Sequence, residues 1–256
     1  MGIFRKNQKV FCGDKNLFDI VKTKAALLKS NFYCLGFDFN FSKKNNLLWD
    51  FEASIGQRKI KYRDLPIPSV PIENIALCLA VLELEFFFPN FRIKDYISNF
   101  KMLGRMSVLK KQDTGLPLDI LFDGAHNAHA SINLANSLSK NTNFIYASRL
   151  HIVFHCLFDK NIYNILKSVC DLLINFNKKD VIWYLPQLNN RRSSSFNVLK
   201  KNILSCYTDE IKPSIVLIED IYNLKNLIET NIVNQNDFAI SFGTFNLLGF
   251  LLGDKR

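Results

Sequence analysis

Residues 118–130 read Leu118-Asp119-Ile120-Leu121-Phe122-Asp123-Gly124-Ala125-His126-Asn127-Ala128-His129-Ala130. A short apolar run that ends in an acid and a glycine, followed by an amphipathic stretch, predicts a buried strand that turns directly into a helix. Ligands of open α/β sheets bind at the carboxyl ends of the strands, so we expect Asp123 to face a ligand. A carboxylate beside a helix N-terminus suits the ribose hydroxyls and phosphates of a nucleotide. No Gly-x-Gly-x-x-Gly is present, which excludes the dinucleotide version of this fold.

The same alternation of apolar runs and amphipathic stretches continues to the C-terminus. It predicts a right-handed parallel α/β sheet, and residues 102–256 are expected to form a Rossmann-like domain. The predicted strands are Leu118–Phe122, Leu150–Leu157, Asp180–Leu185, Ser214–Ile218 and Phe238–Phe242, and the predicted helices are 127–139, 162–176, 196–204 and 222–228.

Residues 1–101 have a more irregular pattern and are expected to form a separate domain. A strand is predicted at Lys9–Cys12, several strands within 31–62, and a helix from Glu73 to Phe88 that stops at Pro89. A further helix is predicted over 17–30, with Val21, Ala25, Leu27 and Leu28 on its apolar side. No parallel-sheet unit is expected in this half.

The composition limits the class of protein. The chain has 256 residues, of which 48% are hydrophobic, and this excludes a disordered tail. Its longest uncharged apolar run, 75–82, is far shorter than the ~20 residues of a membrane-spanning helix, so no membrane partner is expected. Six dispersed cysteines and the absence of a signal-like N-terminus favour a cytoplasmic protein. The net charge of +10 is spread along the chain without a nucleic-acid-binding motif, so no nucleic-acid partner is expected.

Several motifs together resemble the folylpolyglutamate synthase/dihydrofolate synthase family of the Mur-ligase superfamily. Gly104-Arg105 followed by D-G-A-H-N-A-H-A is similar to the family's P-G-R-F and D-x-A-H-N-P-H-A. Other segments match in the same order along the chain, and these are 2–5, 10–13, 70–76, 158–161, 191–192 and 242–245. The resemblance implies a Mur-type C-terminal Rossmann-like glutamate-ligase domain over 102–256. It also implies that 1–101 is the last part of the family's central ATPase domain.

The resemblance implies an ATP-dependent ligase that adds L-glutamate to dihydropteroate or folates through an acyl phosphate. Arg105 would reach the ATP phosphates and Asp123 the ribose. Asn74 would hold the adenine, and His126 would contact the reacting phosphate or glutamate. Thr244 stands where the family has a serine beside the glutamate, and the added methyl group alters the fit. Further departures from the family pattern are Met106 for Phe, Ala128 for Pro and His155 for Gly.

The family's phosphate loop, Mg²⁺ ligands and modified lysine precede the segment that matches Gly2. The resemblance therefore implies an N-terminally truncated synthase with ATP and Mg²⁺ as cofactors, its metal ligands lying in the missing part. Such a chain is expected to be inactive or impaired alone, and a separately encoded N-terminal fragment is one partner it would need. Two alternatives stay open: another Mur-type amide ligase, and a non-catalytic α/β remnant.

Each candidate residue also has a plain structural interpretation. Arg105 alone is typical of a solvated or salt-bridged side chain, and Asp123 could simply cap the helix that follows. Asn74 could be no more than a helix N-terminal residue. A zinc site built from the four histidines is disfavoured, because no cysteine or carboxylate spacing supports it.

Overall fold

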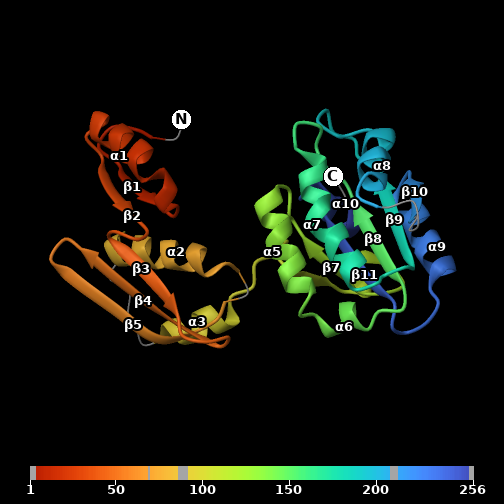
Figure 1. The fold of residues 1–256 in the computed structure, drawn as a ribbon, viewed down its shortest axis with the longest axis horizontal. Coiled ribbons are helices and arrows are strands. Elements are labelled where there is room, and N and C mark those ends of the chain that lie inside the picture. Colours follow the sequence, from red (N-terminus) through yellow and green to blue (C-terminus); the bar gives the residue numbers. More distant parts are fainter. Residues whose placement is uncertain (1–3, 69, 86–91, 208–212, 254–256) are drawn as a thin grey trace. The chain divides into compact units, whose positions relative to one another are not determined.

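The computed structural model describes residues 4–68, 70–85, 92–207 and 213–253. The chain divides into two compact units, Met1–Lys101 and Met102–Arg256, and each is described by itself. Figure 1 labels most of the helices and strands of both units. Within the described residues, no helix is both long enough and apolar enough to cross a membrane.

The first unit contains two small sheets and two longer helices. Its elements are β1 (Lys9–Cys12), a 3-10 helix (Lys15–Leu17), α1 (Phe18–Leu27), β2 (Asn31–Cys34), β3 (Phe39–Lys43), β4 (Leu48–Ile55), β5 (Arg58–Pro66), α2 (Ile72–Glu85) and α3 (Ile93–Asn99). The predicted strand at Lys9–Cys12 is confirmed. The helix predicted from Glu73 begins one residue earlier, and its predicted end at Phe88 and Pro89 lies outside the described residues.

The expectation that this half has no parallel-sheet unit is wrong. β1 and β2 pair in parallel, with Val10 opposite Phe32, and α1 is the helix that connects them. The unit is small, with four residues in each strand, and its periodicity is too short to stand out in the sequence. Val21 and Ala25 of α1 pack with Val10 in a cluster of their own.

The rest of the first unit is an antiparallel meander covered by helices. β3, β4 and β5 pair in sequence order, and the apolar side chains Trp49, Phe51 and Leu65 are fully buried there. Ile75 and Leu79 of α2 complete this core. The buried carboxylate of Glu83, also on α2, accepts a hydrogen bond from the Tyr62 hydroxyl.

Leu27 does not lie on the buried side of α1, contrary to expectation. It is 73% exposed, whereas Val21 is 7% exposed. Six residues at about 100° each place Leu27 roughly 120° away from Val21 around the helix. We therefore expect Val21→Ala to lower the free energy of unfolding by about 1–2 kcal/mol and Leu27→Ala by less than about 0.5 kcal/mol. Urea unfolding of both variants measures the difference, and equal losses would contradict this assignment.

The second unit is a six-stranded sheet with helices on both faces, in the strand order β10-β9-β8-β11-β7-β6. Five strands run parallel, and β6 pairs antiparallel with β7 at the edge. Its elements are β6 (Ser107–Leu109), α4 (Lys111–Thr114), β7 (Ile120–Asp123), α5 (Ala128–Leu138), α6 (Thr142–Ile145), β8 (Leu150–Phe154), α7 (Ile162–Asn175), β9 (Val181–Pro186), α8 (Phe196–Leu204), β10 (Ser214–Ile218), α9 (Ile221–Asn231), β11 (Phe238–Phe242) and α10 (Asn246–Leu252).

The parallel α/β fold predicted for this unit is confirmed, and β10, β11 and α8 have the predicted bounds. The strand predicted to reach Leu157 ends at Phe154, because the chain leaves the sheet there. The short elements β6, α4 and α6 were not predicted, and neither was α10. The strand β6 has three residues, which is too few for a period to appear.

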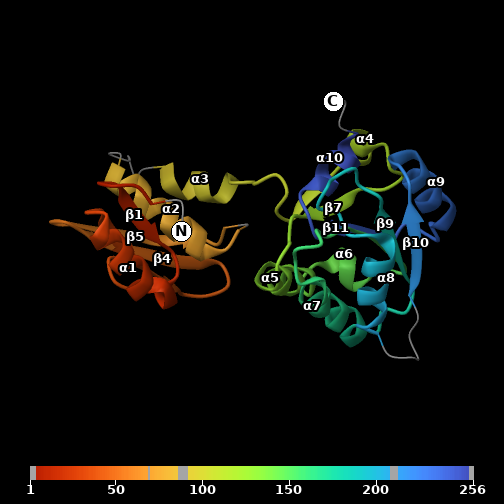
Figure 2. The ribbon, with the colours of Figure 1, turned by 90° about the horizontal axis from the view of Figure 1, so that it is seen from above.

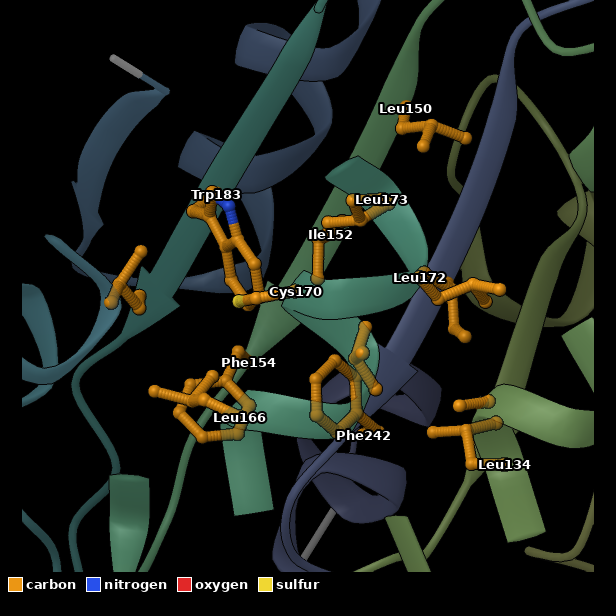
Figure 3. Close-up of a cluster of buried hydrophobic side chains, with 14 of the residues drawn as sticks. Leu134, Leu150, Ile152, Phe154, Leu166, Cys170, Leu172, Leu173, Trp183 and Phe242 are labelled. Carbon is orange, nitrogen blue, oxygen red and sulfur yellow. The ribbon is translucent and has the colours of Figure 1, made fainter. Parts of the chain in front are cut away.

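Two hydrophobic layers hold this sheet between its helices. On one face, Leu134, Leu166 and Trp183 belong to a cluster shared with α5, α7 and α8, part of which is drawn in Figure 3. On the other face, Leu224 and Leu247 bring α9 and α10 against the sheet. Figure 2 shows these two groups of helices on opposite sides of the strands. The strands β7, β8 and β9 are buried along their whole length, as expected for parallel strands covered on both faces.

The order of the strands in the sheet brings residues of several motifs to one edge. The chain passes from β7 to β8 and leaves a gap, which β11 fills by pairing with both. The carboxyl ends of these three strands therefore adjoin. They carry Asp123 as the last residue of β7, His155 after β8, and Gly243-Thr244 after β11.

Candidate functional site

The turn after β7 separates the candidate ligand residue from the helix cap. Asn127 is the N-cap of α5, and its side-chain oxygen accepts a hydrogen bond from the Ala130 N–H at 2.9 Å. Asp123 is the last residue of β7 and contacts a different segment. The interpretation of Asp123 as the cap of this helix is therefore wrong, and its carboxylate must be explained otherwise.

Asp123 is a buried acid, and its carboxylate is bound by the turn that precedes β6. Its Oδ2 accepts a hydrogen bond from the Met106 N–H at 2.9 Å, and its Oδ1 lies 3.8 Å from Arg105 Nη1. Burial raises the pKa of Asp123, and the Met106 N–H and the Arg105 charge oppose that rise. A carboxylate held in this way keeps further lone pairs for hydroxyl donors of a ligand.

Arg105 reaches Asp123 because β6 pairs with β7. Ser107 at the start of β6 is opposite Phe122, so the turn before β6 lies beside the end of β7. Gly104 in that turn has φ +86°, a conformation that favours glycine, and its carbonyl accepts the Gly124 N–H at 2.8 Å. The separation of 3.8 Å between Arg105 and Asp123 is longer than a hydrogen bond, so the guanidinium donors stay available for an anion.

His126 presents a defined tautomer. Its Nδ1 lies 2.8 Å from the carbonyl oxygen of Gly124, which can only accept, so Nδ1 carries the proton and donates it. The lone pair is then on Nε2 of the half-buried ring. His126 therefore combines a fixed orientation with an acceptor that a ligand can use.

Thr244 follows the strand that fills the gap between β7 and β8. It is buried, and its Oγ1 accepts a hydrogen bond from the Asn246 N–H at 3.3 Å. The next residue, Phe245, contacts the segments that carry Arg105 and His126. Four of the five predicted site residues, Arg105, Asp123, His126 and Thr244, thus belong to neighbouring segments of the second unit.

Asn74 belongs to the first unit. It is exposed in the first turn of α2, and its N–H donates to the Pro71 carbonyl at 3.1 Å. A contact between Asn74 and an adenine stays a prediction.

Two other motif segments meet after β8 and β9. The Phe158 N–H donates to the Arg192 carbonyl at 2.9 Å, and the Arg192 guanidinium binds the Asp159 carboxylate. This pairing lowers the pKa of Asp159. The spacing of these segments in the sequence gives no sign of the ion pair, because the helix α7 and the strand β9 separate them.

His151 and His155 have structural partners in the sheet. His151 lies between the Tyr184 hydroxyl, at 3.0 Å, and the Asp237 carboxylate, at 3.4 Å. His155 Nδ1 donates to the Pro186 carbonyl at 3.0 Å. Both rings are buried, and burial lowers the pKa of each. Among the residues that the structure describes, no three His, Cys, Asp or Glu side chains form a group that could hold a metal ion.

The two buried histidines predict a loss of stability in acid. Their lowered pKa values mean that only the unfolded chain takes up these protons as the pH falls below the ordinary 6.5. The free energy of unfolding should then decrease by up to about 1.4 kcal/mol per pH unit for each histidine that stays neutral. His155→Asn keeps a donor for Pro186 and removes one titrating group. Urea unfolding between pH 7 and pH 5.5 should show a shallower loss in this variant, and an unchanged slope would contradict the assignment.

Among the described residues of the second unit, sizeable cavities lie at both ends of the strands. One of about 670 Å³ lies at the carboxyl ends, where Asn190, Asp220 and Phe245 are among its lining residues. A larger one of about 1050 Å³ lies at the amino ends and is lined by residues such as Lys111, Asn141 and Asn236. The smaller cavity lies at the end of the sheet where ligands of parallel sheets bind, and Phe245, which follows Thr244, connects it to the candidate site, although none of the predicted site residues lines it.

Comparison with known proteins identifies relatives, although no family model matches the chain. The dihydrofolate synthase/folylpolyglutamate synthase of Buchnera aphidicola is 26% identical over 235 residues, covering 89% of this chain and 51% of the relative. The Haemophilus influenzae protein of the same name is 22% identical and covers 96% and 55%. The chain spans about half the length of the curated relatives it matches.

Solved structures show the same fold. A bifunctional folylpolyglutamate synthase/dihydrofolate synthase from Yersinia pestis has a TM-score of 0.70 at 22% identity, covering 98% of this chain and 54% of that one. Escherichia coli FolC in complex with ADP has a TM-score of 0.73 at 20% identity, with the same coverage. The order of strands and helices in this chain agrees with the fold of these synthases over 98% of its length. In sequence and fold the chain is similar to dihydrofolate synthase/folylpolyglutamate synthases, and it spans about half the length of those it matches.

Proposed function

We propose that this chain supplies the Arg105–Asp123–His126 site of an ATP-dependent ligase that adds L-glutamate to dihydropteroate or folates. The observation that carries the proposal is the placement of Arg105 and Asp123, 3.8 Å apart at the carboxyl end of β7. Related structures contain ADP, or AMPPNP with Mn and L-glutamate, and this supports nucleotide, divalent metal and glutamate as ligands here. A cytoplasmic location, favoured by six unpaired cysteines, belongs to the same proposal.

Each residue would have a distinct part in binding. The Arg105 guanidinium would neutralise phosphate oxygens, on which charge develops during phosphoryl transfer. Asp123 would accept hydrogen bonds from the ribose hydroxyls, and Asn74 would hold the adenine. In this reaction a carboxylate oxygen takes the γ-phosphoryl group of ATP and ADP leaves. The amine of glutamate then attacks the acyl carbon, releasing phosphate and a proton.

His126 and Thr244 would act on the second half of this reaction. His126 Nε2 carries a lone pair, so it would accept a hydrogen bond from the incoming amine or from a protonated phosphate oxygen. The Thr244 hydroxyl would contact the glutamate, while its methyl group narrows the space beside it. The resemblance implies Mg²⁺ ligands in a segment that precedes the matched part, and the metal would supply charge neutralisation of the phosphates there.

The test combines binding with turnover. Calorimetry should detect ADP binding to the 256-residue chain, and the absence of binding would remove the proposed nucleotide site. Phosphate release with ATP, dihydropteroate and glutamate should be undetectable or low for this chain alone. It should rise when the N-terminal half of the Buchnera relative is added. High turnover by the chain alone would overturn the proposed impairment, and turnover with a peptidoglycan precursor in place of dihydropteroate would indicate a different Mur-type ligase.

A further inference from the structure

Phe245 lies where the segments of the candidate site converge. It follows Thr244 and directly precedes α10, and its side chain is 40% exposed. Its ring contacts both the turn before β6 and the turn after β7. Its ring centre also lies 6.3 Å from that of the buried Phe122, so Phe245 joins the edge of the core to these two turns.

Both glycine turns rest directly on this ring. A Cβ atom added to Gly104 would lie 2.5 Å from Cε1 of Phe245, and one added to Gly124 would lie 2.5 Å from its Cε2. The two glycines are joined to each other by the hydrogen bond between the Gly124 N–H and the Gly104 carbonyl. Because the two turns are hydrogen-bonded to each other and both contact the ring, the position of the ring limits how closely both backbones can approach Phe245.

The functional side chains beside these turns also lie against Phe245. The Arg105 guanidinium carbon is 5.0 Å from the ring centre, within range of a cation–π interaction. The His126 ring centre is 6.3 Å away. Arg105 is 30% exposed and lies 3.8 Å from its carboxylate neighbour, so Asp123 alone does not fix the guanidinium. The aromatic face restricts a side chain that would otherwise sample many rotamers.

We propose that Phe245 is a positioning residue that holds the Arg105 guanidinium over the Asp123 carboxylate, ready for the phosphates of a nucleoside diphosphate. This inference rests on the proposed function and deepens it. Phe245 acts on nucleotide binding through Arg105, and it makes no bond to the nucleotide.

A double-mutant cycle separates this role from general packing. Phe245→Leu keeps apolar bulk and removes the aromatic face. We expect it to weaken ADP binding by the whole chain about 5- to 10-fold, which is the size of one cation–π contact. In the Arg105→Ala background the same change should alter ADP affinity less than about 2-fold. An equal loss in both backgrounds would overturn the proposal.

A readout that needs no nucleotide makes the test independent of the proposed function. Arg105 lowers the pKa of Asp123 against the rise that burial causes, so a freed guanidinium lets that pKa rise further. Carbon-13 NMR titration of the Asp123 carboxyl should show this upward shift in Phe245→Leu. It should not show it in Phe176→Leu, a control of 36% exposure at the end of α7. If Phe245→Leu folded but left the pKa of Asp123 unchanged, the proposal would be overturned. If the pKa of Asp123 rose in Phe245→Leu but the wild type bound no ADP, only the proposed function would be removed.

Discussion

Gly243→Ala is expected to destabilise the second unit by about 4 kcal/mol or more, which would leave little of the stability of a typical domain. Gly243 has φ +110°, a conformation that L residues rarely adopt and that costs about 1–3 kcal/mol when forced. The added Cβ would also overlap the His155 carbonyl oxygen and lie 2.7 Å from Cε2 of Phe154. Neither neighbour can move freely, because Phe154 is fully buried and His155 is held by Pro186. Overpacking of this kind adds typically about 1–3 kcal/mol.

Gly115→Ala is the matched control for this prediction. Gly115 also has a positive φ, +69°, but an added Cβ would meet nothing within 4 Å. The control should therefore lose only about 1–2 kcal/mol from backbone strain. Urea unfolding followed by circular dichroism measures both variants. A Gly243→Ala protein no less stable than Gly115→Ala would show that the close approach of β11 to β8 is not as tight as the structure has it.

The sequence was sufficient to predict the parallel strands of the large sheet but not the order in which they pair. The apolar runs of β8, β9, β10 and β11 are bounded by polar turns, so their existence and parallel direction followed from pattern alone. The insertion of β11 between β8 and β7 depends on which faces pack together, and no local period encodes that. The parallel pair β1 and β2 was missed for a related reason. Each strand has four residues, and only their contacts with α1 make them a unit.

Some residues of the candidate site could likewise be predicted from the sequence, and others depend on tertiary contacts. Asp123 and His126 follow a buried strand and a glycine turn, so they could be predicted as neighbours of a ligand. The approach of Arg105 to Asp123 needed the resemblance to a family, since it depends on the three-residue strand β6. Phe245 was matched only as part of a motif. Its contact with Gly104 and Gly124 comes from residues more than a hundred positions away, and no spacing rule relates them.

Arg105→Ala is expected to weaken ADP binding about 100-fold while leaving the fold intact. Charge-assisted hydrogen bonds to phosphate contribute about 1.5–3 kcal/mol, and about 2.7 kcal/mol corresponds to that factor. The cost in stability should be small, because Arg105 is 30% exposed and beyond hydrogen-bond distance from Asp123. Arg105→Lys keeps the charge without the planar fork, so we expect an intermediate loss of about 10-fold.

The control for this prediction is another arginine of the same sheet. Arg149 precedes β8 at the amino ends of the strands, where its guanidinium binds the Asp180 carboxylate at 2.8 Å. Arg149→Ala should lower the free energy of unfolding and leave ADP affinity within about 2-fold of the wild type, because ligands reach such sheets at the opposite ends of the strands. Calorimetric titration with ADP at two salt concentrations measures both variants, and the wild type should lose more affinity at high salt than Arg105→Ala does. If Arg149→Ala weakened binding as strongly as Arg105→Ala, the phosphates would have to bind at the amino ends, and the assignment of Arg105 and Asp123 to the nucleotide would be wrong.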